Sequence, residues 1–214
     1  KTKAIVAVHY AGVGCNMKKL KEIARKYDLF LIEDAAQGIK ASYDNEPLGS
    51  IGDIGCLSFH ETKNIISGEG GALLINNPEF VERAEIIREK GTNRSRFLSG
   101  YADKYNWIDI GSSFLPGELI AGFLWAQLQE SDFITFKRLE IWSRYETKFK
   151  ELVLNEFIKT PELPASCKHN GHMYFLILNE KINRSNFIKE MNNHSIQMPF
   201  HYIPLHTSPA IKNL

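Results

Sequence analysis

The first 34 residues predict a strand, a helix and a second strand with short connections, and this order constrains the fold more than any other feature. Residues 4–9 read as a buried strand, and apolar residues recur at helical spacing from Met17 to Tyr27. Residues 29–33 form a second apolar run of strand length. A strand–helix–strand unit is typical of a parallel sheet covered by helices. We therefore expect an α/β fold with functional groups at the carboxyl ends of its strands.

The remaining elements extend this sheet and then lead into a second region. Strands are predicted at residues 54–59, 71–75, 172–178 and 196–200, helices at 78–90, 116–153 and 185–193, and a long loop at 91–111. The character of the sequence changes after Pro161 and Pro164. We expect residues 1–149 to form a large domain with a connecting helix. Residues 150–214 are then part of a small α+β domain that is cut off at the end of the chain.

Composition excludes several classes of function. The chain has 214 residues and a net charge of +1, with 26 basic and 25 acidic side chains spread along it. This balance gives no electrostatic footprint for nucleic acid or an anionic membrane. No apolar run approaches the roughly 20 residues of a membrane-spanning helix. Small molecules and other copies of the chain are the expected partners.

The cysteines and histidines give no sign of a disulfide framework or a metal centre. Cys15, Cys56 and Cys167 are odd in number and lack a CxxC pair, and the histidines form neither HExxH nor a cluster at zinc spacing. We expect no metal and a reducing, cytoplasmic setting. The chain also begins without methionine and almost directly with a strand, which indicates a fragment of something longer.

Lys63 lies where an apolar strand gives way to a glycine-rich run. Residues 54–59 precede it, and Ser67-Gly68-Glu69-Gly70-Gly71 follows, a run that allows a tight turn and a close approach of backbone to a ligand. Desolvation of a lysine favours its neutral, nucleophilic form, which can do Schiff-base chemistry. The alternative is an ordinary surface lysine in a loop, as most lysines are.

Polar residues at other strand ends have a plain and a chemical interpretation. A carboxylate after an apolar strand, as at Asp34, needs a cationic partner. That partner is an arginine or helix terminus in the plain interpretation, and the ring nitrogen of pyridoxal phosphate in the chemical one. Gln37 is either a capping residue or a hydrogen-bond donor to the cofactor's phenolic oxygen. Ser58 either forms a hydrogen bond with the backbone at the end of its strand or binds the phosphate. His9 is a core histidine or the wall of a site.

Taken together, four segments closely resemble the sugar-nucleotide aminotransferases of the DegT/DnrJ/EryC1/StrS group. They are His9-Tyr10-Ala11-Gly12, Glu33-Asp34-Ala35-Ala36-Gln37, Ser58-Phe59-His60-Glu61-Thr62-Lys63-Asn64 and Gly68-Glu69-Gly70-Gly71. Their order and spacing are far more specific than any one of them. Within the group, three further segments resemble the members that aminate a 4-keto-6-deoxy nucleotide sugar. They are Arg88-Glu89-Lys90-Gly91-Thr92-Asn93-Arg94-Ser95, Asp109-Ile110-Gly111-Ser112-Ser113 and Phe200-His201-Tyr202-Ile203-Pro204-Leu205-His206.

The resemblance implies the fold, the cofactor and the role of each site residue. The fold would be the fold type I of pyridoxal-phosphate-dependent transferases, with a mainly parallel sheet in the large domain. By family pattern Lys63 carries the cofactor, Asp34 faces its pyridinium nitrogen, Gln37 lies near its ring oxygen and Ser58 binds its phosphate. Ser113 stands where many members have an asparagine that reaches the partner subunit's cofactor. The candidates for substrate contact are His201, His206, Asn93 and Arg94.

The resemblance also implies a cytoplasmic homodimer with glutamate as amino donor, and it leaves alternatives open. The family's chains are much longer, so this chain is either part of an active enzyme or an inactive truncated product that folds or dimerises without holding cofactor. Related members act on a 3-keto sugar. Others replace the lysine with histidine and are sugar dehydratases, whereas Lys63 is retained here, which favours transamination.

Overall fold

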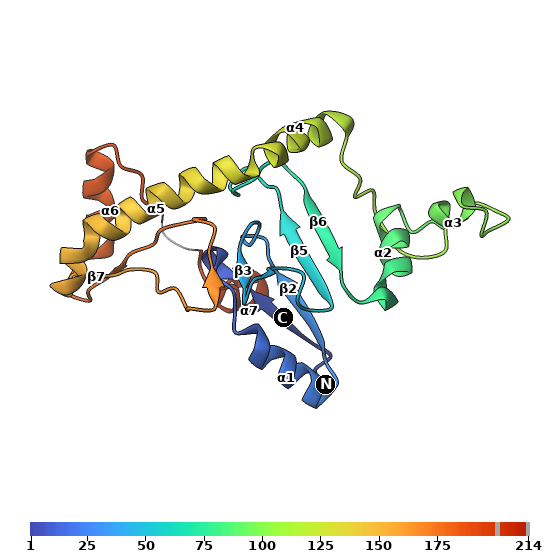
Figure 1. Cartoon of the computed structure of the whole chain (residues 1–214), viewed down its shortest axis with the longest axis horizontal. Coiled ribbons are helices and arrows are strands. Elements are labelled where there is room, and N and C mark those ends of the chain that lie inside the picture. The colour runs from blue at the N-terminus through green and yellow to red at the C-terminus, as the bar shows by residue number, and fades with distance from the viewer. Residues whose placement is uncertain (200–201, 213–214) are drawn as a thin grey trace. The chain divides into compact units, whose positions relative to one another are not determined.

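The computed structural model describes residues 1–199 and 202–212 of the chain (Figure 1). These divide into two compact units, one of residues 1–148 with 161–175 and the other of residues 149–160 with 176–214. The assignment of residues 1–149 and 150–214 to two domains of a larger enzyme stays a prediction.

A four-stranded sheet forms the centre of the first unit. Its order is β1 (Ala4–Val8), β2 (Phe30–Asp34), β5 (Ile54–Ser58) and β6 (Gly71–Ile75). The first three strands are parallel, and β6 runs antiparallel to β5, as the arrows in Figure 1 show. The expected α/β fold with a mainly parallel sheet is confirmed, and β6 is the antiparallel strand at its edge. The carboxyl ends of three strands therefore meet at one edge, where Asp34 lies between Val8 and Cys56.

Helix α1 (Met17–Tyr27) covers one face of this sheet and has the predicted bounds. It begins at Asn16, whose Oδ1 accepts a hydrogen bond from the backbone N–H of Lys19 at 3.1 Å, and it ends at Asp28 in the left-handed conformation. Met17 is fully buried and packs in the core with Leu31 and other apolar residues of β1 and β2. The apolar face of the helix thus anchors the strand–helix–strand unit.

The opposite face of the sheet is open in this chain. Val6 and Val8 of β1 are 59% and 49% exposed, and Leu73 of β6 is 52% exposed. Paired residues on parallel strands point to the same side, so Asp34 shares this face with Val8. The adjacent Glu33 points to the covered face and is fully buried.

The middle of the chain is more helical than predicted. A 3-10 turn η2 (Pro78–Phe80) leads into α2 (Val81–Arg88), and α3 (Arg94–Leu98) forms within the segment predicted as a loop. The single helix predicted at residues 116–153 is two helices, α4 (Glu118–Gln129) and α5 (Ser131–Leu154). They are separated at Glu130, whose ψ of 7° departs from helical geometry.

Residues 161–175 belong to the first unit because β8 (Cys167–Lys168) pairs with β3 (Ser42–Tyr43), which also pairs with β4 (Glu46–Pro47). The strand predicted at residues 172–178 is therefore wrong over most of its length. Gly171 adopts a left-handed φ of +64° and interrupts the extended backbone there. Only β9 (Ile177–Leu178) remains, and it pairs with β7 (Ile158–Lys159) in the second unit.

The second unit also contains α6 (Arg184–Asn193), η3 (Leu205–Thr207) and α7 (Pro209–Lys212). The strand predicted at 196–200 does not form over residues 196–199, and Phe200 lies outside the described residues. The backbone N–H of Ile196 instead donates to the carbonyl oxygen of Met191 at 2.9 Å and caps α6, so it is not available to a sheet. Within the described ranges, no helix is both long and apolar enough to span a membrane.

Candidate active site

Asp34, the last residue of β2, presents a carboxylate at the carboxyl edge of the sheet. Its Oδ1 accepts a hydrogen bond from the backbone N–H of Ala36 at 3.1 Å, which fixes the carboxylate at the start of the following turn. Its Oδ2 has no hydrogen bond to any described residue, and the side chain is only half-buried. One oxygen is therefore available to a cationic group on the open side of the sheet.

Cys56 lies beside this carboxylate on β5. Burial and, second, the charge of Asp34 raise the pKa of the Cys56 thiol. The thiol therefore stays protonated next to the acid. The two residues paired with Asp34 on the neighbouring strands are Val8 and Cys56, and neither carries a positive charge.

Lys63 lies in the loop between β5 and β6, within the same edge of the sheet. Its backbone N–H donates to the carbonyl oxygen of His60 at 2.9 Å, and Ser58 Oγ accepts from the N–H of His60 at 3.3 Å. The loop closes at Gly68 and Gly70, whose φ angles of +82° and +138° suit glycine, so the predicted tight turn is confirmed. Lys63 is half-buried as a residue, and its ammonium makes no hydrogen bond or ion pair with any described residue.

Gln37 joins the turn after β2 to the turn after β1. Its Oε1 accepts a hydrogen bond from the backbone N–H of Ala11 at 2.6 Å. Ala11 belongs to η1 (Tyr10–Gly12), the 3-10 turn that follows His9. The amide nitrogen of Gln37 donates to no residue in the described ranges and so remains a donor. Its role beside a cofactor oxygen, and that of the Ser58 hydroxyl beside a phosphate, stay predictions.

His172, Asn64 and Asn170 also contact this region, and sequence reasoning missed all three. His172 Nδ1 and Asn64 Oδ1 are 2.8 Å apart, and Asn64 Nδ2 donates to the carbonyl oxygen of Asn170 at 2.9 Å. Burial and, second, the positive charges of Lys63 and Arg138 lower the pKa of His172 to about 4, so its ring is neutral near pH 7. The Asn170-Gly171 pair, a frequent turn signal, was the one sequence sign of this contact.

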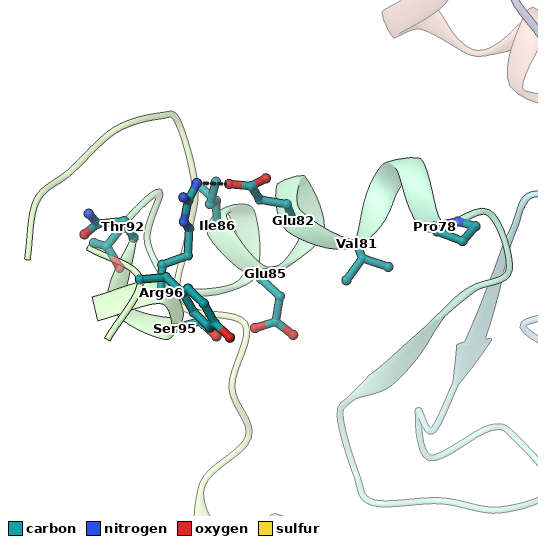
Figure 2. Close-up of a pocket in the computed structure, with 10 residues that line it drawn as sticks. Pro78, Val81, Glu82, Glu85, Ile86, Thr92, Ser95 and Arg96 are labelled. Carbon is teal, nitrogen blue, oxygen red and sulfur yellow. Dashed lines mark hydrogen bonds and ion pairs between the residues drawn. The ribbon is translucent and has the colours of Figure 1, made fainter. Parts of the chain in front are cut away.

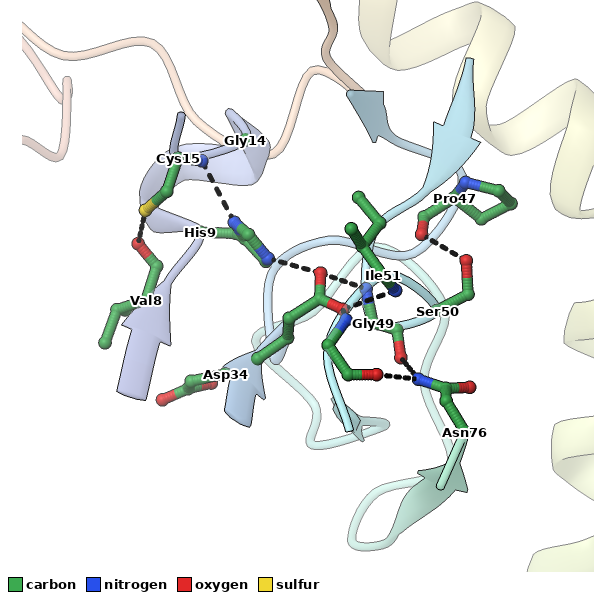
Figure 3. Close-up of polar contacts among 12 residues, drawn as sticks. Val8, His9, Gly14, Cys15, Asp34, Pro47, Gly49, Ser50, Ile51 and Asn76 are labelled. Carbon is green, nitrogen blue, oxygen red and sulfur yellow. Dashed lines mark hydrogen bonds and ion pairs between the residues drawn. The ribbon is translucent and has the colours of Figure 1, made fainter. Parts of the chain in front are cut away.

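His9 is a fully buried core histidine rather than the wall of a site, and Figure 3 shows its ring between Cys15 and the carboxylate of Glu33. Its Nδ1 accepts from the N–H of Cys15 at 3.1 Å, so the proton is on Nε2, which donates to Glu33 Oε2 at 2.8 Å. Both side chains are fully buried. The pair lies on the covered face of the sheet, away from the face that Asp34 shares.

Glu33 is also bound by the loop that precedes β5. The backbone N–H groups of Gly49, Ile51 and Gly52 donate to its two oxygens at 2.9, 2.6 and 2.6 Å. Burial opposes the charge of Glu33, but the hydrogen bonds from His9 and from these N–H groups outweigh it and lower the pKa of the carboxyl. Glu33 therefore holds the end of β2 in place. Nothing in the sequence showed that Glu33, rather than the adjacent Asp34, has this structural role.

Asn93 and Arg94, the predicted substrate contacts at the start of α3, each have a partner in the protein. Asn93 Nδ2 donates to the carbonyl oxygen of Lys104 at 2.9 Å, and Asn93 Oδ1 accepts from the N–H of Asn106 at 2.8 Å. Arg94 forms an ion pair with Glu89, which is buried. These contacts hold the 93–106 loop, and a role in substrate binding stays a prediction.

The remaining predicted site residues are Ser113, His206 and His201. No contact within the described residues brings any of them to Lys63. Ser113 is exposed in an extended segment that bridges to Glu89. His206 is exposed in η3 of the second unit. His201 lies outside the described residues.

A separate hollow of about 360 Å³ lies between α2 and α3 (Figure 2). Glu82 and Glu85 line it, and the only arginine in its lining, Arg96, forms an ion pair with Glu82 at 2.6 Å. An acidic lining with its arginine already paired does not suit the phosphates of a nucleotide sugar. The strand ends around Asp34 and Lys63 are the better candidate site.

The model of the DegT/DnrJ/EryC1/StrS aminotransferase family matches residues 1–214. The chain belongs to this family. An uncharacterized protein of Methanocaldococcus jannaschii is 38% identical over 98% of this chain and 55% of its own length. GDP-perosamine synthase of Caulobacter vibrioides is 29% identical over 100% of this chain and 56% of its own length. The chain thus spans about half the length of the curated relatives it matches.

A solved structure of the family fold agrees with the chain throughout. Helicobacter pylori PseC, an aminotransferase involved in the biosynthesis of pseudoaminic acid, matches with a TM-score of 0.89 at 25% identity. The match covers 100% of this chain and 56% of PseC. The fold is therefore that of the pyridoxal-phosphate-dependent transferases of fold type I, and this part of the fold prediction is confirmed. The truncated small domain stays a prediction.

Enzymes of the DegT/DnrJ/EryC1/StrS family use pyridoxal phosphate, and one sugar aminotransferase with this fold has been solved in its PLP form. The residues of this chain fit that group. Lys63 offers a half-buried amine with no acid partner among the described residues, and Asp34 offers a carboxylate oxygen that no described residue occupies. Ser58 and Gln37 add a hydroxyl and an amide nitrogen at the same edge of the sheet.

Proposed function

We propose that the protein containing this chain is a pyridoxal-phosphate-dependent aminotransferase that converts a keto group of a nucleotide sugar into an amine. The observation that carries the proposal is the pairing of Lys63 and Asp34. Asp34 ends β2, and Lys63 lies in the loop that follows the adjacent strand β5, at the same carboxyl edge of the sheet. Neither head group is neutralised by a described residue. In α/β sheets, ligands bind at this edge.

When bound, pyridoxal phosphate supplies an aldehyde that exchanges amines and a ring that accepts electrons. Lys63 would hold that aldehyde through Nζ, and whenever Nζ is free it would take and return a proton as general base. Asp34 Oδ2 would hold a proton on the ring nitrogen, because a carboxylate beside that atom favours its charged form. Ser58 and Gln37 would donate hydrogen bonds to the phosphate and the phenolic oxygen.

The finer proposal concerns the substrate. Segments 88–95, 109–113 and 200–206 resemble dTDP-4-amino-4,6-dideoxygalactose transaminase. We propose that dTDP-4-dehydro-6-deoxyglucose is aminated at position 4 with glutamate as donor, in surface lipopolysaccharide or enterobacterial common antigen synthesis. The named relatives differ in their sugars, with GDP-perosamine synthase as one example. Incubation of the intact protein with dTDP-, GDP- and UDP-linked keto sugars tests this, and amination of only a GDP or UDP sugar, or of a 3-keto group, would overturn it.

A test of the general function replaces Lys63 by alanine. Addition of pyridoxal phosphate to the intact protein should give a visible absorbance band, and borohydride should fix the cofactor on Lys63 in a peptide digest. Lys63→Ala should lose both signals, whereas Lys18→Ala, on the exposed side of α1, should keep them. A band that survives in Lys63→Ala, or its absence from the wild type, would contradict the proposal.

The proposal for Asp34 has a separate test. Asp34→Asn keeps the hydrogen bond that Oδ1 accepts but removes the charge. Turnover should fall on the order of 100-fold, the scale of removing one preorganised electrostatic group. The unfolding transition should change little because the side chain is only half-buried. Full turnover in Asp34→Asn would remove this residue from its role.

We also propose that two copies of the protein pair in the cytoplasm. Helix α4 exposes Leu119, Phe123 and Trp125, which are 91%, 51% and 65% exposed, and exposed large apolar side chains gathered on one helix favour an interaction site. Sedimentation of the intact protein should give the mass of a dimer, and Trp125→Glu should shift it toward the monomer.

A further inference from the structure

Asn170 is a fully buried asparagine whose side-chain hydrogen-bonding groups are all used. Its Nδ2 donates to the carbonyl oxygens of Gln37 and Ile39 at 2.8 and 2.7 Å, and its Oδ1 accepts from the N–H of His172 at 3.0 Å. These contacts fix the turn after β2, which carries Gln37, against a segment more than 130 residues away in sequence. One side chain therefore sets the position of a predicted cofactor contact.

Asn64, the residue after Lys63, joins the lysine loop to the same segment. Its side chain is 5% exposed, its Nδ2 donates to the carbonyl oxygen of Asn170, and its Oδ1 faces His172 Nδ1. An amide oxygen only accepts hydrogen bonds, so His172 Nδ1 carries the proton. The neutral ring of His172 thus acts as a donor to the residue next to Lys63.

The surroundings leave this cluster little freedom. A Cβ atom at Gly12 would lie 2.1 Å from Asn170 Oδ1, so the turn after β1 packs directly on the asparagine. On the other side, Arg138 of α5 donates to the carbonyl oxygens of Gly171 and His172 at 3.2 and 2.7 Å. The cluster is held by three separate parts of the first unit.

We propose that Asn64, Asn170 and His172 are positioning residues that hold the Lys63 loop and the Gln37 turn at one fixed separation. The proposal rests on the aminotransferase function proposed above, because it concerns how the amine of Lys63 meets a cofactor held near Gln37. A displacement of about 1 Å in a reacting group slows a reaction on the order of 100-fold, so small shifts of this loop matter. None of the three residues needs to touch the cofactor.

Two substitutions of His172 separate positioning from chemistry by the ring itself. In His172→Asn the side-chain amide nitrogen takes the place of Nδ1 and can still donate to Asn64, whereas His172→Leu cannot. In the intact protein, His172→Leu should lower kcat by about 10- to 100-fold with little change in KM, and His172→Asn should restore most of that loss. If His172→Asn is as slow as His172→Leu, the ring acts directly and the proposal is wrong.

A comparison of Asn64 with Asn76, an exposed asparagine that also binds backbone carbonyls, separates positioning from stability. Asn76 resembles Asn170 and Asn64 in that its Nδ2 donates to backbone carbonyls, those of Gly49 and Gly52, both at 2.9 Å. It follows β6, whose antiparallel direction places it at the edge opposite Lys63. Asn64→Ala and Asn76→Ala should both unfold at lower denaturant concentration. Only Asn64→Ala should bind pyridoxal phosphate to Lys63 more slowly, by about 10-fold or more.

Two measurements compare Asn64→Ala with Asn76→Ala, and the second of them does not require an active enzyme. The first is the rate at which the visible band forms after cofactor is added to the apoprotein. The second is amide hydrogen exchange of residues 62–64 without cofactor, which should speed up in Asn64→Ala and not in Asn76→Ala. Suppose that borohydride fixes the cofactor on Lys63 of the wild type, but that cofactor attachment and amide exchange are equally fast in the two variants. This result would overturn the positioning role alone. No label on Lys63 in the wild type would overturn the aminotransferase function and this inference with it.

Discussion

Two buried polar networks flank the carboxyl edge of the sheet, and they differ in charge and in what they hold. The first is centred on the ionised Glu33, which binds His9 and the loop of residues 49–52 on the covered face of the sheet (Figure 3). The second is centred on the neutral amide of Asn170, which binds the Gln37 turn and, through Asn64, the loop of Lys63. Loss of the first should mainly destabilise the fold, whereas loss of the second should mainly displace the lysine.

The largest expected effect is on the charged network. Glu33→Ala leaves three backbone N–H groups and His9 without their acceptor in a fully buried place, which should lower the free energy of unfolding by about 3 to 5 kcal/mol. Urea unfolding monitored by circular dichroism measures this. Glu22→Ala, exposed on α1, is the control and should change little. A loss below about 1 kcal/mol for Glu33→Ala would show that the network does not hold β2.

A methyl group at Gly12 should disturb the neutral network alone. Gly12 has a φ of +75°, and an alanine Cβ there would meet Asn170, so Gly12→Ala should lower the free energy of unfolding by about 2 to 4 kcal/mol. It should also slow cofactor attachment to Lys63, because Asn170 must move. Gly122→Ala in α4 is the control, since its Cβ would meet nothing within 4 Å and alanine favours a helix. Normal cofactor attachment in Gly12→Ala would separate Asn170 from the lysine loop.

The two networks should respond to acid in different pH ranges. The pKa of His172 falls from 6.5 to about 4 on folding, so between these values the unfolded chain binds more protons and stability falls as pH decreases. The slope contributed by one such group approaches about 1.4 kcal/mol per pH unit. The lowered pKa of Glu33 contributes stability that is present above 4.5 and is lost as pH falls further. His172→Asn should flatten the unfolding free energy between pH 6.5 and 4, and Glu33→Gln should flatten it below that range, as measured by urea unfolding at each pH.

The smallest expected effect is at the rim of the neutral network. Arg138→Lys replaces a planar group that donates to two carbonyl oxygens by a single ammonium and should cost about 1 kcal/mol in unfolding free energy. Arg88→Lys, in an exposed ion pair with Glu85, is the matched control and should cost less than about 0.5 kcal/mol. Equal losses would mean that the 171–172 turn does not depend on Arg138.

Local patterns predicted the elements that depend on neighbouring residues. Helix α1 and strand β6 have the predicted bounds because a helical or strand period within a few residues decides which side is buried. Predictions failed where a distant contact overrides the local pattern. Residues 172–175 have strand-like composition, yet Asn170 and Gly171 bend the chain there so that it can reach Gln37 and Asn64.

The candidate site shows the same division. The order of motifs placed Asp34, Ser58 and Lys63 together because parallel strands bring their carboxyl ends to one edge. Asn64 was within a recognised segment but had no visible role, since its partners lie more than 100 residues further along the chain.

The sequence by itself determined the strand–helix–strand unit at the start of the chain, the family, and a lysine and an acid that follow adjacent strands, because short-range periodicity and motif spacing encode them. Only the tertiary structure decided that neighbouring acids do different work. Glu33 faces the core and is bound by His9 and three N–H groups, whereas Asp34 faces the open side with one oxygen unoccupied by described residues. The physical reason is that alternate residues of a strand point to opposite faces, and what covers each face depends on the path of the whole chain.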